Sequence, residues 1–284
     1  MITNKIILFG KSGFVSSNFQ QLLKSKKLKF KAIGSKDINL LSIKSSKKLI
    51  KFNKKNNEYI IYFFSALTPD KGKDEFTFLK NIQMISNFFK FFPNKKISRF
   101  IYISSDAVYG NSEIINDKTK PSPVDLYGYM HLIREQIIAL HLDKKNICIL
   151  RPTAIFGVGD THNSYGPNRF YKQSNDTSKI TLFGKGLDIR DHLYIKDFCL
   201  VLFKLFNKKI NGTYPIASET SYSFVNVAEI IKYYFKTQKN TNIKIEFIPN
   251  NSKPSKKNFS SLVYKKLFKI KSSPFKKSIL HYFK

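Results

Sequence analysis

The chain has 284 residues and a formal charge of +31, which comes from 50 lysine and arginine residues against 19 aspartate and glutamate residues. That length is sufficient for one large domain with a smaller lobe attached. The two cysteines, Cys148 and Cys199, lack CxxC spacing, so neither a disulfide framework nor a metal site is expected. The longest apolar stretch, 59–67, is too short for a membrane-spanning helix. Since the first residues also lack a secretory signal pattern, we expect a cytoplasmic protein without a membrane partner.

The positive charge does not by itself indicate a nucleic-acid partner. Lysines are spread along the whole chain together with many Ile, Asn and Phe residues, which is typical of an AT-rich genome. Proteins that recognise base edges rely on the bidentate fork of arginine. Only five arginines occur: Arg99, Arg134, Arg151, Arg169 and Arg190. Four of them fall inside the motifs described below and indicate positions that need a planar donor, whereas Arg99 has no such context. We expect no nucleic-acid partner, although a positive field can attract anionic nucleotides.

Short apolar runs alternate with helical patterns in the first half of the chain, which predicts an α/β fold with a doubly wound, Rossmann-like parallel sheet. The expected strands are 6–9, 28–33, 59–64, 100–104 and 147–150. The expected helices are 15–26, 45–52, 76–91 and 127–141.

After Pro152 the pattern changes to Gly, Pro and Asn, which predicts a smaller, discontinuous lobe. We expect the sheet domain to span 1–156 and about 187–217, and the lobe to span about 157–186 and 218–284. Later elements are expected at 191–206 (helix), 212–217 (strand), 225–235 (helix) and 243–247 (strand).

A glycine-containing turn, Gly10-Lys-Ser-Gly13-Phe-Val-Ser16, follows the first strand and opens the first helix. Gly10 permits a tight turn, Gly13 lets a pyrophosphate approach the backbone, and the helix N-terminus supplies amide donors. The turn predicts a dinucleotide site, with a purely structural turn as the weaker alternative. The expected cofactor-binding residues here are Gly10, Lys11, Ser12, Gly13, Phe14 and Val15.

Two further strand ends bear on the cofactor. At the end of the second strand, Lys36 precedes Asp37. A basic residue at this position tolerates the 2′-phosphate of NADP, so NADP is weakly favoured over NAD. The third strand is followed by Ser65, Ala66 and Leu67. The first two are small residues, which allow the backbone to lie close to a cofactor, and plain packing is the alternative.

Three segments carry the chemistry: Tyr102-Ile-Ser-Ser-Asp-Ala-Val-Tyr-Gly110, Tyr127-Gly-Tyr-Met-His131 and Leu150-Arg-Pro-Thr-Ala-Ile-Phe-Gly157. They resemble the SSxxVYG, YxxxK and LRPxxxYG segments of the extended short-chain dehydrogenases/reductases, within the NAD-dependent epimerase/dehydratase family. The glycine turn resembles that family's GxxGxxG, with Ser16 in place of the third glycine. The resemblance implies NAD(P), a nucleotide-linked sugar as substrate, and hydride transfer in an epimerase or a reductase.

By that resemblance Ser105 hydrogen-bonds the substrate oxygen, Tyr127 transfers the proton, and Asp106 occupies a position where sugar-nucleotide dehydratases hold an acid. Ala107 replaces the Glu that a 4,6-dehydratase needs, which disfavours dehydration. The resemblance adds Ser104, Tyr127, His131 and Pro152 to the cofactor-binding set. It also matches Asn81 to an asparagine that braces the active site, with an ordinary solvated helix residue as the alternative.

His131 stands where the family carries lysine. Lysine holds the nicotinamide ribose and its charge lowers the pKa of the tyrosine, whose ordinary value is about 10, whereas histidine is mostly neutral at pH 7. Three outcomes stay open: a working enzyme with a more alkaline optimum, an enzyme with a compensating group, or a dinucleotide-binding sensor or scaffold without catalysis. We favour a tolerated substitution.

The segments around Asn168 and Arg190 resemble PNxF and GxGxxxRDxxxVxD of nucleotide-sugar epimerases and reductases, which implies that both side chains contact the nucleotide diphosphate. Arg169 is expected either to bind substrate or to belong to the scaffold, and both alternatives stay open. His162 is expected either to contact substrate or to be an exposed loop residue. Arg134 and Arg151 are expected to form scaffold ion pairs, and Asp197 to be structural.

Members of the family often form homodimers through the helices that follow strands three and four. The apolar helix 76–91 suits that role, and burial in its own core explains it equally well.

Overall fold

The computed structural model describes residues 3–160, 166–260 and 262–282. The chain divides into two compact units, each described by itself. Unit 1 comprises Met1–Gly110, Pro121–Arg151 and Cys199–Tyr214. Unit 2 comprises Asn111–Lys120, Pro152–Phe198 and Pro215–Lys284. Relative to the expected boundaries, residues 111–120, 152–156, 187–198 and 215–217 belong to the other part of the chain.

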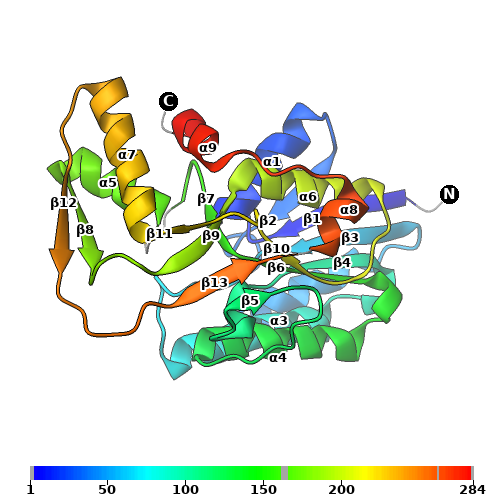
Figure 1. The fold of residues 1–284 in the computed structure, drawn as a ribbon. Helices are drawn as coiled ribbons and strands as arrows, with labels where there is room; N and C mark the ends of the chain where they lie inside the picture. The colour runs from blue at the N-terminus through cyan, green and yellow to red at the C-terminus, as the bar shows by residue number, and fades with distance from the viewer. Residues whose placement is uncertain (1–2, 161–165, 261, 283–284) are drawn as a thin grey trace. The chain divides into compact units, whose positions relative to one another are not determined.

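A six-stranded sheet forms the centre of unit 1 in the part of the chain that is described, in the order β10-β6-β4-β3-β1-β2 (Figure 1). Its strands are β1 (Thr3–Phe9), β2 (Phe30–Ile33), β3 (Asn57–Phe63), β4 (Ile97–Ile103), β6 (Ile147–Pro152) and β10 (Gly212–Ile216). The ladders from β2 to β6 are parallel. The strands are buried almost throughout, as parallel strands covered on both faces must be. The predicted α/β, Rossmann-like sheet is confirmed.

Helices cover both faces of this sheet (Figure 1). On one face, Phe19 of α1 (Phe14–Ser25) packs against Tyr62, whose hydroxyl donates to the Leu202 carbonyl of α6 (Ile195–Asn207). On the other, α3 (Glu75–Phe91) and α4 (Leu126–His141) run side by side, and Phe88 of α3 packs edge-on against Phe9. A hydrogen bond between His131 of α4 and Tyr102 of β4 places α4, which also carries Tyr127, over β4.

Two expected helices have different bounds. The segment 45–52 is divided between α2 (Ile43–Ser46) and the 3-10 helix η1 (Lys47–Phe52). The segment 191–206 does not begin as a helix, because its first residues belong to β9 (Ile189–Tyr194), which pairs with β7 (Ala154–Phe156) and β11 (Ser221–Ser223). Strand pairing with distant segments therefore decides the structure there, and the helix starts only at Ile195.

The sheet order reverses between β1 and β3, where doubly wound sheets bind their ligands. The turn after β1 has Gly10 at a φ of +100°, and both the Gly10 and Lys11 amides donate to the Ile33 carbonyl. A side chain on Gly10 would place its Cβ 2.9 Å from the Ser65 nitrogen. Only glycine therefore allows the turn after β1 to lie against the chain that leaves β3.

Unit 2 contains two smaller sheets among its described residues. One has the order β11-β9-β13-β5, with β7 also paired to β9, and the other pairs β8 with β12. The remaining strands are β5 (Ile114–Ile115), β8 (Lys179–Phe183), β12 (Lys244–Ile248) and β13 (Lys256–Phe259). The helices are α5 (Pro167–Thr177), α7 (Phe224–Lys239), α8 (Val263–Phe268) and α9 (Phe275–Tyr282). Short 3-10 helices complete the fold: η2 (Asn94–Lys96), η3 (Asp106–Tyr109) and η4 (Lys144–Asn146).

Within the described ranges no helix combines the length and the apolar character that crossing a bilayer requires.

Candidate active site

The first turn of α1 is open to an anion. Its N-cap residue, Gly13, makes no side-chain hydrogen bond to the helix, so no side chain occupies the amides of the first turn. Lys11 and Ser12 are exposed, whereas the Phe14 side chain is buried in the core and only its amide can face a ligand. Gln20 donates to the Lys11 carbonyl at 2.7 Å and holds the turn in place. This arrangement fits the pyrophosphate of a dinucleotide.

At the end of β2, the Asp37 carboxylate accepts a hydrogen bond of 2.9 Å from the Gly34 amide. That bond lowers the pKa of Asp37, with smaller contributions from the nearby Lys11, Lys31 and Lys51. Lys36 is exposed in the same turn. The Asp37 carboxylate is thus bound to the backbone and surrounded by positive charge.

Asn81 of α3 braces the chain that leaves β3. Its side chain accepts from the Leu67 amide at 2.8 Å and donates to the Leu67 carbonyl at 2.9 Å. Asn81 is almost fully buried, so the alternative of a solvated helix residue is wrong. Both polar groups of Leu67 are fixed, which holds Ser65 and Ala66 beside the glycine turn.

Ser105 and Tyr127 are brought together by the contact between η3 and the start of α4. Ser105 caps η3 by accepting from the Ala107 amide at 3.1 Å, and its hydroxyl lies 3.4 Å from an Asp106 oxygen. A Cβ on Gly128 would lie 2.6 Å from the Ala107 carbonyl oxygen, so the helix can approach η3 only because residue 128 is glycine. Both Ser105 and Tyr127 keep part of their surface exposed.

A buried ion pair lies beneath these residues. Arg151 of β6 donates to both oxygens of Glu135 of α4, at 3.0 and 2.6 Å. Ser104 donates to the same carboxylate at 2.6 Å, and Arg151 also reaches the Tyr109 hydroxyl at 3.3 Å. Burial alone would lower the pKa of Arg151, but the hydrogen bond and charge of Glu135 raise it instead. The expected ion pair of Arg151 is present, and Ser104, whose hydroxyl is engaged here, is less suited to hold a ligand than Ser105.

His131 lies on the face of α4 that packs on the sheet and is 2 % exposed. Its Nδ1 is 2.7 Å from the hydroxyl of Tyr102 in β4, and its ring stands perpendicular to that of Tyr127 with centroids 4.7 Å apart. Nε2 is buried and has no hydrogen-bond partner among the described residues. Burial, and then the charge of Arg134, lower the pKa of His131 well below its ordinary value. The imidazole is therefore neutral.

Arg134 differs from its expected role. Instead of pairing with a carboxylate, its Nε donates to the Asn81 carbonyl at 3.0 Å, and its guanidinium lies over the rings of Phe63 and Tyr102. The planar cation is thus used for stacking and for a main-chain bond that joins α4 to α3.

In unit 2 the expected substrate residues are engaged within the unit. Asn168 accepts from the Gly157 amide at 3.4 Å and donates to Asp160, while Arg190 donates to the Ser255 carbonyl and hydroxyl at 3.0 and 2.6 Å. Arg169 lies over the Phe183 ring. His162 lies outside the described residues, and Pro152 is the buried last residue of β6.

Next to Arg190, the buried Asp191 accepts from the amides of Ser218 and Thr220, and burial raises its pKa to about 6 against these hydrogen bonds. Asp197 accepts two bonds of 2.7 Å from Ser273, in agreement with its expected structural role.

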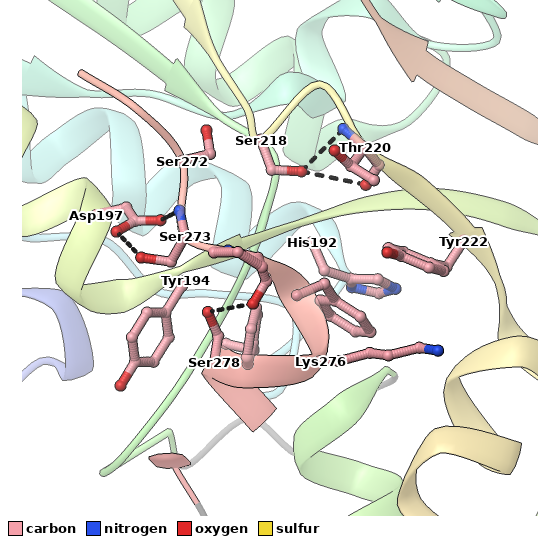
Figure 2. A pocket seen from close by; sticks show the side chains of 13 residues that line it. His192, Tyr194, Asp197, Ser218, Thr220, Tyr222, Ser272, Ser273, Lys276 and Ser278 are labelled. Atoms are coloured by element: carbon pink, nitrogen blue, oxygen red, sulfur yellow. Dashed lines mark hydrogen bonds between the residues drawn. The ribbon is translucent and has the colours of Figure 1, made fainter. Parts of the chain in front are cut away.

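Unit 2 contains a cavity of about 320 Å³. Figure 2 shows the side chains that line it. His192 and Tyr194 of β9 line one side and the segment from Ser272 to Ser278 another. Burial lowers the pKa of His192 to about 3, so this histidine is neutral too. Asn168, Arg169 and Arg190 are not among the residues that line this cavity.

The sequence analysis did not identify the roles of Glu135 and Tyr102. Glu135 is hydrogen-bonded to Ser104 and Arg151, and Tyr102 is hydrogen-bonded to His131. Glu135 had a detectable signal, because it lies four and eight residues after His131 and Tyr127 and therefore shares their helix face. Tyr102 had none, since its partner is identified only when α4 packs on β4. Within the described residues, no group of three or more His, Cys, Asp or Glu side chains could hold a metal ion.

A parallel sheet with an open helix N-terminus at its switch point, and a Ser/Tyr pair beside it, defines a dinucleotide-binding protein of the Rossmann-like class. Residues 6–217 match the model of the NAD dependent epimerase/dehydratase family, and the chain belongs to that family, whose members include NAD(P)-dependent epimerases, reductases and dehydratases of nucleotide sugars.

Individual relatives are distant. A GDP-6-deoxy-D-talose 4-dehydrogenase from Aggregatibacter actinomycetemcomitans is 23 % identical over 233 residues, 80 % of this chain and 79 % of that protein. The ADP-L-glycero-D-manno-heptose-6-epimerase of Helicobacter pylori has a similar fold, with a TM-score of 0.82, 18 % identity and coverage of 99 % and 95 %. The dTDP-4-dehydrorhamnose reductase of Bacillus anthracis, solved with NADP, has a TM-score of 0.81, 17 % identity and coverage of 99 % of each chain.

Replacing Glu135 by glutamine tests the buried ion pair. Glu135→Gln leaves the Arg151 cation buried without a counter-charge, so the free energy of unfolding should fall by about 3–5 kcal/mol. Urea denaturation measures this loss. The matched control is Asp143→Asn, which breaks an exposed pair with Lys145 in the same unit and should leave stability unchanged within error. Equal losses in both variants would contradict the assigned importance of Glu135.

Proposed function

We propose that the protein is an epimerase or reductase that transfers hydride between NAD(P) and a carbon of a nucleotide-linked sugar, with Ser105, Tyr127 and His131 as its site. The observation that carries the proposal is the contact of Gly128 with Ala107, which brings the first turn of α4 against the Ser105 loop. Family membership supports the substrate class.

The roles follow from the groups that the site presents. Bound nicotinamide supplies or accepts the hydride. In the reducing direction, the Ser105 hydroxyl donates a hydrogen bond to the sugar carbonyl oxygen, and Tyr127 gives that oxygen its phenolic proton as the carbon is reduced. In the oxidising direction, Tyr127 takes the proton from the sugar hydroxyl. Reduction uses these steps once, whereas epimerisation uses them in both directions around a ketone intermediate.

Ala107 argues against a 4,6-dehydratase. Removing a proton beside the carbonyl needs a second base, and the residue after Asp106 has only a methyl side chain. Asp106 itself is compatible with reduction.

A second candidate is a dinucleotide sensor without turnover. The neutral, buried His131 favours it, because the site lacks the lysine charge that helps a tyrosine to lose its proton.

Tyr127→Phe distinguishes these candidates. The variant keeps the ring but has no transferable proton, so kcat with 4-keto nucleotide sugars should fall by about 10²–10⁴-fold while dinucleotide binding is retained. Oxidation of NADPH or NADH measures turnover, and fluorescence titration measures binding. Tyr129→Phe, on the exposed side of the same helix, should keep the wild-type rate. Tight dinucleotide binding without turnover in the wild type and in His131→Lys would instead support the sensor.

We also propose a preference for NADP, based on the bound Asp37 carboxylate and the lysines around it. Lys36→Glu should weaken NADPH binding about tenfold relative to NADH, because the variant places a negative charge where the 2′-phosphate is expected. Calorimetric titration of both dinucleotides measures the ratio. Lys24→Glu, the same charge change at the exposed end of α1, is the control. Equal effects of both substitutions would show that only net charge matters.

We further propose that a second copy of the chain covers the outer face of α3 and α4. Leu126, Ile133 and Leu140 of α4 are 41 %, 38 % and 82 % exposed at heptad spacing, and Phe76 of α3 is 65 % exposed. Sedimentation velocity should show a dimer, and Ile133→Glu should produce a monomer. Leu200→Glu, at a similarly exposed leucine of α6 on the opposite face of the sheet, should remain dimeric. A monomeric wild type would refute this assignment.

A further inference from the structure

The hydrogen bond between Tyr102 and His131 raises the question of which ring nitrogen of the histidine carries the proton. His131 is neutral, so one of its two ring nitrogens has a hydrogen and the other a lone pair. Nδ1 and the Tyr102 hydroxyl are 2.7 Å apart and share one hydrogen. The charged and titratable groups that face this pair are Arg134, Glu135 and Tyr127 from α4, with Tyr102 itself the group from β4.

Either the Tyr102 hydroxyl donates this hydrogen to Nδ1, or Nδ1–H donates it to the hydroxyl oxygen. The surroundings of the hydroxyl decide between these two arrangements. Burial raises the pKa of Tyr102 to about 12, so its oxygen keeps its proton. If Nδ1–H donated to that oxygen, the phenolic proton would need another acceptor. The cation beside it, Arg134, has only donors, and the Glu135 carboxylate is engaged by Ser104 and Arg151. The hydroxyl therefore donates to Nδ1.

We propose that Tyr102 is a positioning residue that holds His131 in the Nε2–H form and so presents a neutral, directional donor to an oxygen of the bound dinucleotide. This inference rests on the proposed function, and it deepens it. The two nitrogens lie on opposite flanks of the imidazole, so Nε2 points away from β4 when Nδ1 points to Tyr102. Nε2 is buried and has no partner among the described residues, as expected of a donor whose acceptor arrives with a ligand.

The chemical consequence concerns the missing lysine. A lysine supplies both a hydrogen bond and a positive charge, whereas the His131 form fixed by Tyr102 supplies the hydrogen bond alone. The ligand is then oriented without a cation beside Tyr127, and the orientation does not change with pH as long as His131 stays neutral.

Nitrogen-15 NMR of histidine-labelled protein tests the assignment without requiring activity. The His131 signal, identified by its absence in His131→Gln, should show an unprotonated Nδ1 and a protonated Nε2, unchanged from pH 5.5 to 8.5. In Tyr102→Phe the two nitrogens should move toward averaged shifts, because Nδ1 has lost its donor. A proton on Nδ1 in the wild type, or an unchanged signal in Tyr102→Phe, overturns the proposal.

Binding provides the second measurement. Tyr102→Phe should weaken NADPH or NADH binding about three- to tenfold, the usual effect of a disturbed hydrogen bond. Tyr62→Phe is the matched control, because it removes another buried tyrosine hydroxyl that is hydrogen-bonded on the opposite face of the sheet. Equal affinities in Tyr102→Phe and the wild type would overturn the binding role. Absence of turnover in every protein would refute the proposed enzyme and leave the NMR result standing.

Discussion

The site of this protein depends on one buried carboxylate. Glu135 receives two hydrogen bonds from Arg151 and one from Ser104, and so joins the ends of β4 and β6 to the middle of α4. A buried charge is tolerated only when its partners satisfy it completely, which makes the geometry of such a junction strict. His131 and Tyr127 lie about one and two turns before Glu135 on the same helix face. The packing around this carboxylate consequently sets the position of both residues, and Tyr127 keeps part of its surface exposed whereas His131 is buried.

The core rather than the surface accommodates His131. Its imidazole is buried and is hydrogen-bonded to Tyr102 inside the sheet. Arg134 completes this arrangement by stacking over Tyr102, and its own positive charge disfavours protonation of the His131 imidazole. The helix face thus holds the Arg134 cation, which stacks within the core, next to a neutral imidazole at the candidate site.

The sequence predicts most of the main sheet, because β1, β3, β4 and β6 are continuous apolar runs buried on both faces. It misplaces the start of α6, since the strand character of β9 arises from its pairing with β7 and β11, where Leu193 pairs with Ile155 and Arg190 pairs with Tyr222. No local sequence pattern contains partners that are so distant along the chain. The motif spacing predicts Ser105 and Tyr127 as site residues. It cannot identify Tyr102 as the partner of His131, because that pair spans 29 residues and exists only once the helix packs on the strand.

The close approach at Gly128 has a consequence for anyone who wishes to change the substrate range by mutagenesis. Ala107 and Gly128 touch without room for one further carbon atom, so the loop 105–110 and the opening of α4 form a single mechanical block. Libraries that vary one side of this contact alone will mostly sample clashes. Diversity at Asp106 or Val108 should therefore be combined with compensating changes at the helix start, and glycine at position 128 left as it is.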